Sequence, residues 1–211
     1  MAIATVTMKN VHVVVMNNLI EEIRVFGREN HVPIILDEGL EVLLDVIKKE
    51  NVKSVLEVGT AIAYSAINMA SLGASVTTIE RDKNMIEIAS NNIKRANLED
   101  KIRIIECDAK EALPLIQNQK FDLIFIDAAK GSYRKFFDDF KDLLTDKGII
   151  VCDNMEFHGL VMQEDLSGCS RQLRQMIKKL RDFREYLESN KEFNTVFINV
   201  GDGLTISKKN N

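Results

Sequence analysis

Short apolar runs alternate with longer amphipathic stretches along most of the chain. Five of these runs are rich in β-branched residues, as expected for strands that are covered on both faces. They comprise residues 54–58, 75–79, 102–105, 121–126 and 148–152. Helical periodicity fills the intervals at residues 63–71, 82–96, 109–117 and 133–144. This alternation predicts a doubly wound parallel sheet of the α/β class.

The two ends of the chain depart from this alternation. Helical segments near residues 18–28 and 36–49 precede the first strand, and a long basic helix is expected over about residues 169–187. Two further strands, 193–200 and 204–207, are joined by Gly201-Asp202-Gly203. So short a link requires an antiparallel pair. The sequence therefore predicts a single domain, residues 1–211, in which N-terminal helices (1–50) precede a mostly parallel seven-stranded sheet (51–211) ending in an antiparallel hairpin.

The composition narrows the class of partner and the compartment. The chain has 28 Lys and Arg residues against 32 Asp and Glu residues, a formal net charge of -4, which excludes an overall basic coat but not a local basic face. Three widely spaced cysteines indicate reduced thiols. No apolar run approaches the roughly 18 residues that span a bilayer, and no secretory signal is recognisable. We therefore expect a cytoplasmic protein without a membrane partner.

Acidic residues end three successive predicted strands. The first strand leads into Glu57-Val58-Gly59-Thr60, where the glycine permits a sharp turn at the ligand-binding edge of the sheet. The absence of G-x-G-x-x-G disfavours a dinucleotide. Glu57 in an apolar strand favours a cationic ligand, such as the amino group or sulfonium of S-adenosylmethionine, over a structural carboxylate. Glu80, 21 residues after Gly59, is placed to accept from ribose hydroxyls, and Asp108 to reach an adenine amino group.

A second set of polar residues follows the fourth and fifth predicted strands. Asp127 ends the fourth, and Asp153 and Asn154 follow the fifth. Because neighbouring parallel strands end at the same edge, two carboxylates and an amide oxygen can converge there, a ligand set that suits Mg²⁺. Lys130 would lie close enough to act as a general base. The alternative is a pair of ordinary strand-end carboxylates with a solvated lysine.

These strings resemble those of the cation-dependent, catechol-type O-methyltransferases that use S-adenosylmethionine. The likeness covers about residues 30 to 207. Glu57-Val58-Gly59-Thr60 with Tyr64-Ser65 resembles the cofactor loop of that family, and Phe125-Ile126-Asp127 with Lys130, and Asp153-Asn154, resemble its metal and base motifs. Ala63 departs from the pattern, since relatives commonly carry glycine there. The resemblance implies a class I, Rossmann-like methyltransferase fold.

The resemblance also implies a role for each matching residue. Asp127, Asp153 and Asn154 would bind Mg²⁺, and Lys130 would be the catalytic base. The residues expected to bind the cofactor are Ile35 or its neighbour Ile34, Glu57, Gly59, Ser65, Glu80, Asp108, Ala109 and Asp127. A homodimer is implied as well.

Within that family, the C-terminal part resembles the bacterial tRNA 5-hydroxyuridine methyltransferases, which form 5-methoxyuridine at the wobble position. The similar strings are residues 200–207, the basic helix before them, and His31-Val32-Pro33-Ile34. Cations spaced three or four apart line one face of that helix, as in a phosphate-binding stripe. The alternative is an amphipathic helix with a solvated basic face. The expected RNA-binding residues are Arg171, Arg174, Lys178, Lys179 and Arg181.

Three functions follow as hypotheses. The first is metal-dependent O-methylation of 5-hydroxyuridine in tRNA. The second is O-methylation of a small catechol or caffeoyl-type molecule, in which the basic helix only faces solvent. The third is a non-catalytic nucleotide-binding or RNA-binding protein, which the presence of Asp127, Lys130, Asp153 and Asn154 together disfavours.

Overall fold

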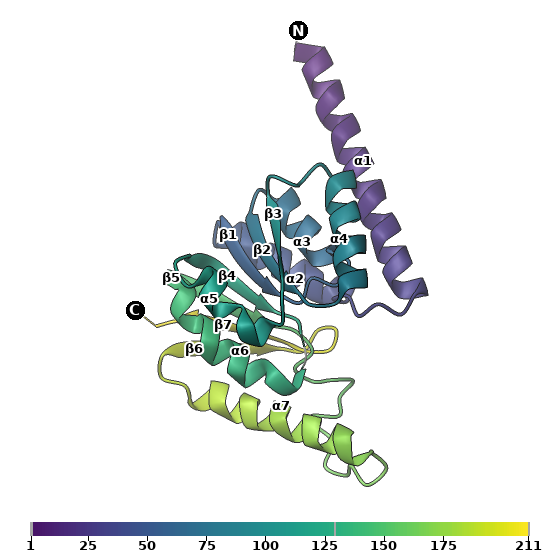
Figure 1. Cartoon of the computed structure of the whole chain (residues 1–211). Coiled ribbons are helices and arrows are strands. Elements are labelled where there is room, and N and C mark those ends of the chain that lie inside the picture. Colours follow the sequence, from purple (N-terminus) through teal and green to yellow (C-terminus); the bar gives the residue numbers. More distant parts are fainter. Residues whose placement is uncertain (1, 129, 211) are drawn as a thin grey trace.

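A single sheet organises the residues that the computed structural model describes, namely 2–128 and 130–210, with side chains from Val13 onward. Within these residues seven strands pair in the order β3-β2-β1-β4-β5-β7-β6 (Figure 1). The parallel strands are β1 (Ser54–Val58), β2 (Ser75–Glu80), β3 (Ile102–Glu106), β4 (Phe121–Ile126) and β5 (Leu144–Cys152). β7 (Leu204–Lys209) is antiparallel to both β5 and β6 (Phe193–Ile198). The predicted parallel sheet with an antiparallel C-terminal hairpin is confirmed.

Helices cover both faces of the sheet (Figure 1). One layer consists of α1 (Ala2–Glu29), α2 (Asp37–Lys49), α3 (Tyr64–Ser71) and α4 (Lys83–Arg95), and the other of α5 (Leu113–Ile116), α6 (Tyr133–Phe140) and α7 (Arg171–Ser189). Neighbouring residues of one strand enter opposite cores. Val55 packs with the first layer and Leu56 with the second, as Leu123 and Ile124 do in β4. Both faces are therefore buried, which explains the continuous apolar runs in the sequence.

Two helices differ from the sequence-based expectation. α1 begins at Ala2 rather than near residue 18, and its N-terminal part extends beyond the body of the molecule (Figure 1). The expected helix over 109–117 is instead a 3₁₀ turn (Ala109–Glu111) followed by the four-residue α5. Pro114 stands at the start of α5, because proline has no backbone N–H and cannot continue a helix begun earlier. Of the described helices, none is both long and apolar enough to cross a lipid bilayer.

The strand order places the ends of β1 and β4 side by side in the middle of the sheet. From β1 the chain moves outward to β2 and β3 and then returns to β4 on the other side of β1, which creates a switch point where open α/β sheets bind ligands. Gly59 follows β1 with a φ of 105°, and a Cβ there would lie 2.1 Å from the backbone oxygen of Asp127. Only glycine allows the two strand ends to approach this closely.

Candidate active site

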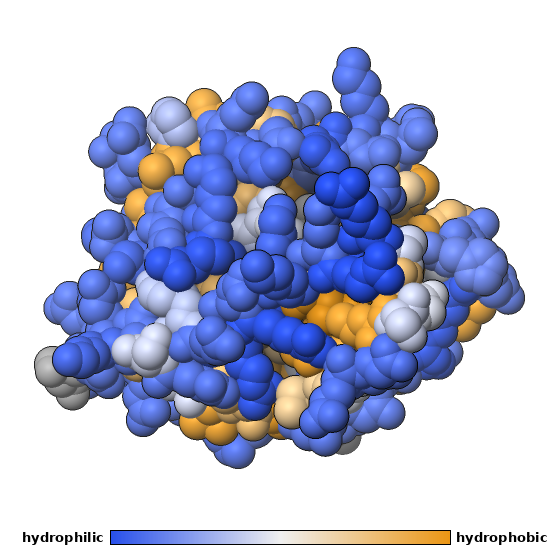
Figure 2. Space-filling model, turned by 90° about the horizontal axis from the view of Figure 1, so that it is seen from below, coloured by the Kyte–Doolittle hydropathy of each residue, from blue (hydrophilic) through white to orange (hydrophobic). Residues whose placement is uncertain are grey.

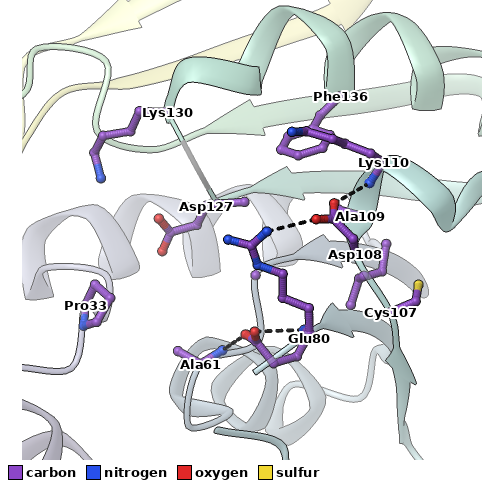
Figure 3. A pocket seen from close by; sticks show the side chains of 14 residues that line it. Pro33, Ala61, Glu80, Cys107, Asp108, Ala109, Lys110, Asp127, Lys130 and Phe136 are labelled. Atoms are coloured by element: carbon purple, nitrogen blue, oxygen red, sulfur yellow. Dashed lines mark hydrogen bonds and ion pairs between the residues drawn. The ribbon is translucent and has the colours of Figure 1, made fainter. Parts of the chain in front are cut away.

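Two adjoining cavities open at the carboxyl ends of the parallel strands. The first, of about 390 Å³, lies over β1, β2, β3 and β4 (Figure 3). The second, of about 310 Å³, lies over the ends of β4 and β5 and reaches the Gly201-Asp202-Gly203 turn. Pro33, Asp127 and Lys130 line both cavities. Asp127, expected to contact both cofactor and metal, and Lys130, the expected base, therefore lie on a wall that the two cavities share.

Glu80 and Asp108 lie on the wall of the first cavity, where the strand-end pattern predicted them (Figure 3). The Glu80 carboxylate accepts hydrogen bonds from the backbone N–H groups of Ala61, at 2.9 Å, and of Arg81, at 2.9 Å. Asp108 accepts from the backbone N–H of Lys110 and forms an ion pair with Arg81 at 2.8 Å. These contacts hold the pKa of Asp108 below its ordinary value. Sequence reasoning missed Arg81, because the pairing joins two different strand ends.

Glu57 and Ser65 are not on the wall of the first cavity. Glu57 is fully buried in β1 and accepts hydrogen bonds from the hydroxyls of Ser65, at 2.5 Å, and Thr78, at 2.6 Å. Thr60 lies 2.6 Å from Thr78 and completes this buried polar chain. In this structure the expected cationic partner of Glu57 is replaced by hydroxyl donors from α3 and β2. The signal for this arrangement is the pair of threonines in the otherwise apolar β2.

Replacing Glu57 with glutamine is expected to change how stability depends on pH. Burial raises the pKa of Glu57 from 4.5 to about 7, although the hydrogen bonds from Ser65 and Thr78 act in the opposite direction. A raised folded-state pKa stabilises the fold below pH 4.5, and this contribution is lost as the pH rises through about 7. The free energy of unfolding should therefore fall by up to about 3 kcal/mol more in the wild type than in Glu57→Gln between pH 4.5 and 8. Urea unfolding across that range measures it, and parallel curves for the two proteins would contradict it.

Asp127, Asp153 and Asn154 converge as the sequence predicts. The Asn154 side-chain amide lies 3.3 Å from Asp127 Oδ1 and 3.1 Å from Asp153 Oδ2, and the Asn154 backbone N–H donates to Asp153 at 2.7 Å. Asn154 has a left-handed backbone (φ 59°), which asparagine tolerates better than most residues. Burial and mutual repulsion raise the pKa of Asp153, and burial raises that of Asp127. A dication between the two carboxylates would remove this repulsion.

The chain supplies only part of the ligand set that a hard cation needs. Across residues 2–128 and 130–210, no group of three or more histidine, cysteine or acidic side chains could hold a metal ion. Two carboxylates and one amide remain, and rotating the Asn154 amide would present its oxygen in place of its nitrogen. Magnesium accepts such a partial set, since it commonly keeps water or substrate oxygens as its other ligands.

Lys130 lines both cavities and is the first residue of the 3₁₀ turn (Lys130–Ser132) that leads into α6. Its ammonium group is 5.4 Å from the centre of the Phe157 ring, a cation–π distance. Phe157 and His158 line the second cavity together with Asp202. Neither Phe157 nor Asp202 was among the predicted site residues, because each reaches the site through a loop rather than a strand end.

The prediction for Ile35 needs correction, and the structure shows the backbone conformation at Ala63. Ile35 is 3% exposed and belongs to the hydrophobic core, so it does not line either cavity. Pro33 and Ile34 lie at the cavity walls instead. Ala63 has a φ of 65° and is completely buried. A left-handed alanine costs about 1 kcal/mol, so glycine would fit this backbone better.

The predicted basic helix is α7, capped by Ser170, and it packs through Ile177 and Leu180. The cations of its outer face divide into two groups. Arg174 donates to the backbone oxygen of Cys169 and Arg181 to that of Val161, so these two hold the loop that follows Asn154. Arg171, Lys178 and Lys179 are exposed. On the side of the molecule where α7 lies, an apolar area opens between strongly hydrophilic side chains (Figure 2).

The strand order, with β7 inserted between β5 and β6, is that of the Rossmann-like class I methyltransferases. Residues 9–210 match the O-methyltransferase family model, and the chain belongs to that family. It is 31% identical over 191 residues to a caffeoyl-CoA O-methyltransferase from Populus kitakamiensis, covering 87% of this chain and 81% of the relative.

Solved structures agree with this assignment. A Staphylococcus aureus protein provisionally named a caffeoyl-CoA O-methyltransferase is 41% identical, with a TM-score of 0.86 over 90% of this chain and 92% of that one. An O-methyltransferase from Bacillus cereus, solved in complex with SAH, is 25% identical, with a TM-score of 0.79 over 92% of this chain and 91% of that one.

Proposed function

We propose that this O-methyltransferase transfers a methyl group from S-adenosylmethionine to the 5-hydroxyl of 5-hydroxyuridine in tRNA, with Mg²⁺ as the metal. The observation that carries the proposal is that Asp127 and Lys130 line both cavities, while Asp153 and Asn154 line the second beside them. A methyl donor in the first cavity and a hydroxyl acceptor in the second would meet at the wall that the two cavities share.

The residues of the first cavity fit an adenosine-containing cofactor. The Glu80 carboxylate accepts three backbone hydrogen bonds, from Ala61, Arg81 and Asp82, and keeps acceptor capacity for ribose hydroxyls. Asp108 and Ala109 lie where an adenine ring would be recognised, once the exposed side chain of Arg81 turns away from Asp108. Gly59, which has no side chain, would let the methionine part of the cofactor approach the backbone at the end of β1. The SAH complex of the Bacillus cereus relative supports this choice of cofactor.

The chemistry needs a deprotonated acceptor oxygen aligned with the methyl group. Asp127, Asp153 and Asn154 would hold Mg²⁺, which lowers the pKa of a bound hydroxyl. Lys130 would remove the proton from the 5-hydroxyl, since it lines both cavities. Holding donor and acceptor in fixed positions on either side of the shared wall would supply much of the rate.

The position of α7 favours RNA as the carrier of the acceptor. A Cβ on Gly131, the residue after Lys130, would lie 3.7 Å from Lys179 Nζ, so the exposed cations of α7 begin at the edge of the site. Arg171 and Lys178 continue this basic surface. A polynucleotide whose base enters the second cavity would run its phosphates along these side chains.

A small catechol or caffeoyl-type acceptor is the second candidate. The Populus kitakamiensis relative, named for caffeoyl-CoA, favours it. Two vicinal oxygens are common to a catechol and to the O5 and O4 atoms of 5-hydroxyuridine, so the metal ligands serve either acceptor equally. The two candidates differ in whether the α7 surface contributes to binding.

The deciding experiment offers the protein tRNA containing 5-hydroxyuridine, and separately a catechol, with S-adenosylmethionine and Mg²⁺. Nucleoside mass spectrometry is expected to show 5-methoxyuridine, and a chelator should abolish its formation. Methylation of the catechol without any 5-methoxyuridine would discard the RNA substrate.

Reversing charge at Lys178 and Lys179 is expected to weaken tRNA binding more than any single-site change on α7. Both side chains are exposed, and neither makes the loop contacts that Arg174 and Arg181 make. The slope of log affinity against log salt concentration is negative, and loss of two phosphate contacts should make it less steep by about 1.5 to 2. Filter binding at several salt concentrations measures it for Lys178→Glu/Lys179→Glu. Lys147→Glu/Lys191→Glu, exposed cations off α7, is the matched control, and equal slopes would exclude this face.

We also propose a homodimer formed through α1. Val13, Val14 and Val15 are each more than half exposed, on a helix whose N-terminal part extends beyond the body (Figure 1). Isolated helices depend on packing for stability, so a second copy would supply the missing contacts. Sedimentation at equilibrium measures the mass, and a monomer at micromolar concentration would refute this assembly.

A further inference from the structure

The second cavity is lined by a histidine that is paired with a carboxylate. His158 Nδ1 is 3.1 Å from Asp202 Oδ1, and both residues line this cavity but not the first. His158 lies beside Phe157, with 4.9 Å between the ring centres. Neither His158 nor Asp202 is a ligand of the Asp127–Asp153–Asn154 cluster.

The backbone fixes this pair at a cost in strain. Phe157 and His158 both have left-handed backbones, with φ of 43° and 56°, and such conformations persist only where surrounding contacts enforce them. Backbone hydrogen bonds join the loop after Asn154 to the turn before β7. The Glu156 N–H donates to the backbone oxygen of Asp202 at 2.8 Å, and the Met155 N–H donates to that of Gly203 at 2.9 Å. A Cβ on Gly203 would lie 2.5 Å from Glu156 Cγ, so the turn must have glycine there.

Asp202 determines which nitrogen of His158 carries the proton. A carboxylate accepts a hydrogen bond, so the neutral imidazole keeps its proton on Nδ1 and leaves Nε2 as an acceptor. The cavity wall therefore offers an acceptor that seeks an N–H or O–H donor on the methyl acceptor. A hydrocarbon ring edge cannot satisfy it.

The direction of methyl transfer orients the acceptor ring between the cavities. The hydroxyl that receives the methyl group must face the first cavity, across the wall formed by Asp127 and Lys130. The ring edge beyond the neighbouring oxygen would then face the part of the second cavity that the first does not share, whose lining includes His158 and Asp202. In 5-hydroxyuracil that edge carries the N3–H donor after O4, whereas in a catechol the same position carries only C–H.

We propose that His158, oriented by Asp202, is a specificity-determining residue that accepts a hydrogen bond from the N3–H of the pyrimidine substrate and so selects a 5-hydroxyuracil ring over a catechol. This inference rests on the proposed function and adds to it the group that distinguishes the two candidate acceptors.

The test compares two matched acceptors, 5-hydroxyuridine and its N3-methyl derivative, with the wild type, His158→Phe and His158→Gln. In the wild type, N3-methylation is expected to raise KM about tenfold with kcat changed much less, because the bond is made equally before and during transfer. In His158→Phe the two acceptors should have similar KM values. His158→Gln, which restores an acceptor near the Nε2 position, should recover part of the difference.

Asp202→Asn separates the role of the pair from that of the ring alone. An asparagine amide can donate to Nδ1, which moves the imidazole proton to Nε2 and turns the acceptor into a donor. This variant should lose the preference for 5-hydroxyuridine as completely as His158→Phe does. Thermal unfolding and binding of S-adenosylmethionine, measured on each variant, confirm that the fold and the first cavity are intact.

The outcomes distinguish this inference from the proposed function. Suppose that the wild type methylates 5-hydroxyuridine, but N3-methylation raises KM as much in His158→Phe as in the wild type. The increase in KM is then steric, so the role of His158 is overturned while the proposed function stands. If the wild type methylates a catechol and neither 5-hydroxyuridine nor tRNA, the proposed function fails and the selection of a pyrimidine edge fails with it.

Discussion

Replacing Asp153 with asparagine is expected to lower kcat/KM for methyl transfer by roughly a thousandfold, as loss of several kcal/mol of charge stabilisation by a metal implies. Asp153 is 3% exposed, and burial and the charge of Asp127 raise its pKa. Its ionised form is therefore unfavourable in the unliganded fold. Removing the charge should leave the free energy of unfolding unchanged or increase it, while Mn²⁺ binding followed by electron paramagnetic resonance is lost.

The combination of lost activity, lost metal binding and retained stability is the signature of a ligand. Asp165→Asn is the matched control, since Asp165 is exposed in the loop before α7 and hydrogen-bonds to the nearby Ser167. It should keep both activity and Mn²⁺ binding. An Asp153→Asn variant that still turns over at the wild-type rate would remove Asp153 from the site.

Replacing Lys130 with methionine is expected to lower kcat by about 10² to 10⁴, the usual contribution of a general base. Lys130 lines both cavities, and its ammonium lies 5.4 Å from the Phe157 ring. Methionine keeps most of the apolar stem and removes the proton acceptor. Quenched single-turnover experiments at saturating S-adenosylmethionine measure the rate of the methyl-transfer step directly.

The pH dependence distinguishes a lost base from a distorted site. Without Lys130, only acceptor molecules whose hydroxyl has already lost its proton to solvent can react. The activity of Lys130→Met should therefore increase with pH more steeply than that of the wild type. Lys135→Met on α6, whose wild-type side chain pairs with Asp139 at 2.7 Å, serves as the control. A loss of activity of equal size at every pH would assign Lys130 a structural role.

Local pattern was sufficient for most of the fold. The five parallel strands are buried on both faces, which leaves continuous apolar runs that the sequence shows directly. Strand-end chemistry also follows from local order, since parallel strands must end at the same edge. Asp127, Asp153 and Asn154 could therefore be expected to meet before any contact between them was known.

The N-terminal helix and the region after β3 were predicted less well, for physical reasons. The start of α1 contains β-branched residues and no clear polar face, so it lacks the periodicity that identifies a helix. After β3, Pro114 interrupts an apolar pattern that by itself suits one continuous helix.

The succession of strands and helices along the chain, the sheet edge where polar residues gather and the types of those residues could all be predicted from sequence pattern. The tertiary structure alone decided which of those residues face the cavities. Glu57 is satisfied by Ser65 and Thr78, and Arg174 and Arg181 bond to the loop after Asn154. Hydrogen bonds between segments far apart in the chain leave no periodic signal, because each depends on the distance between groups that only folding brings together.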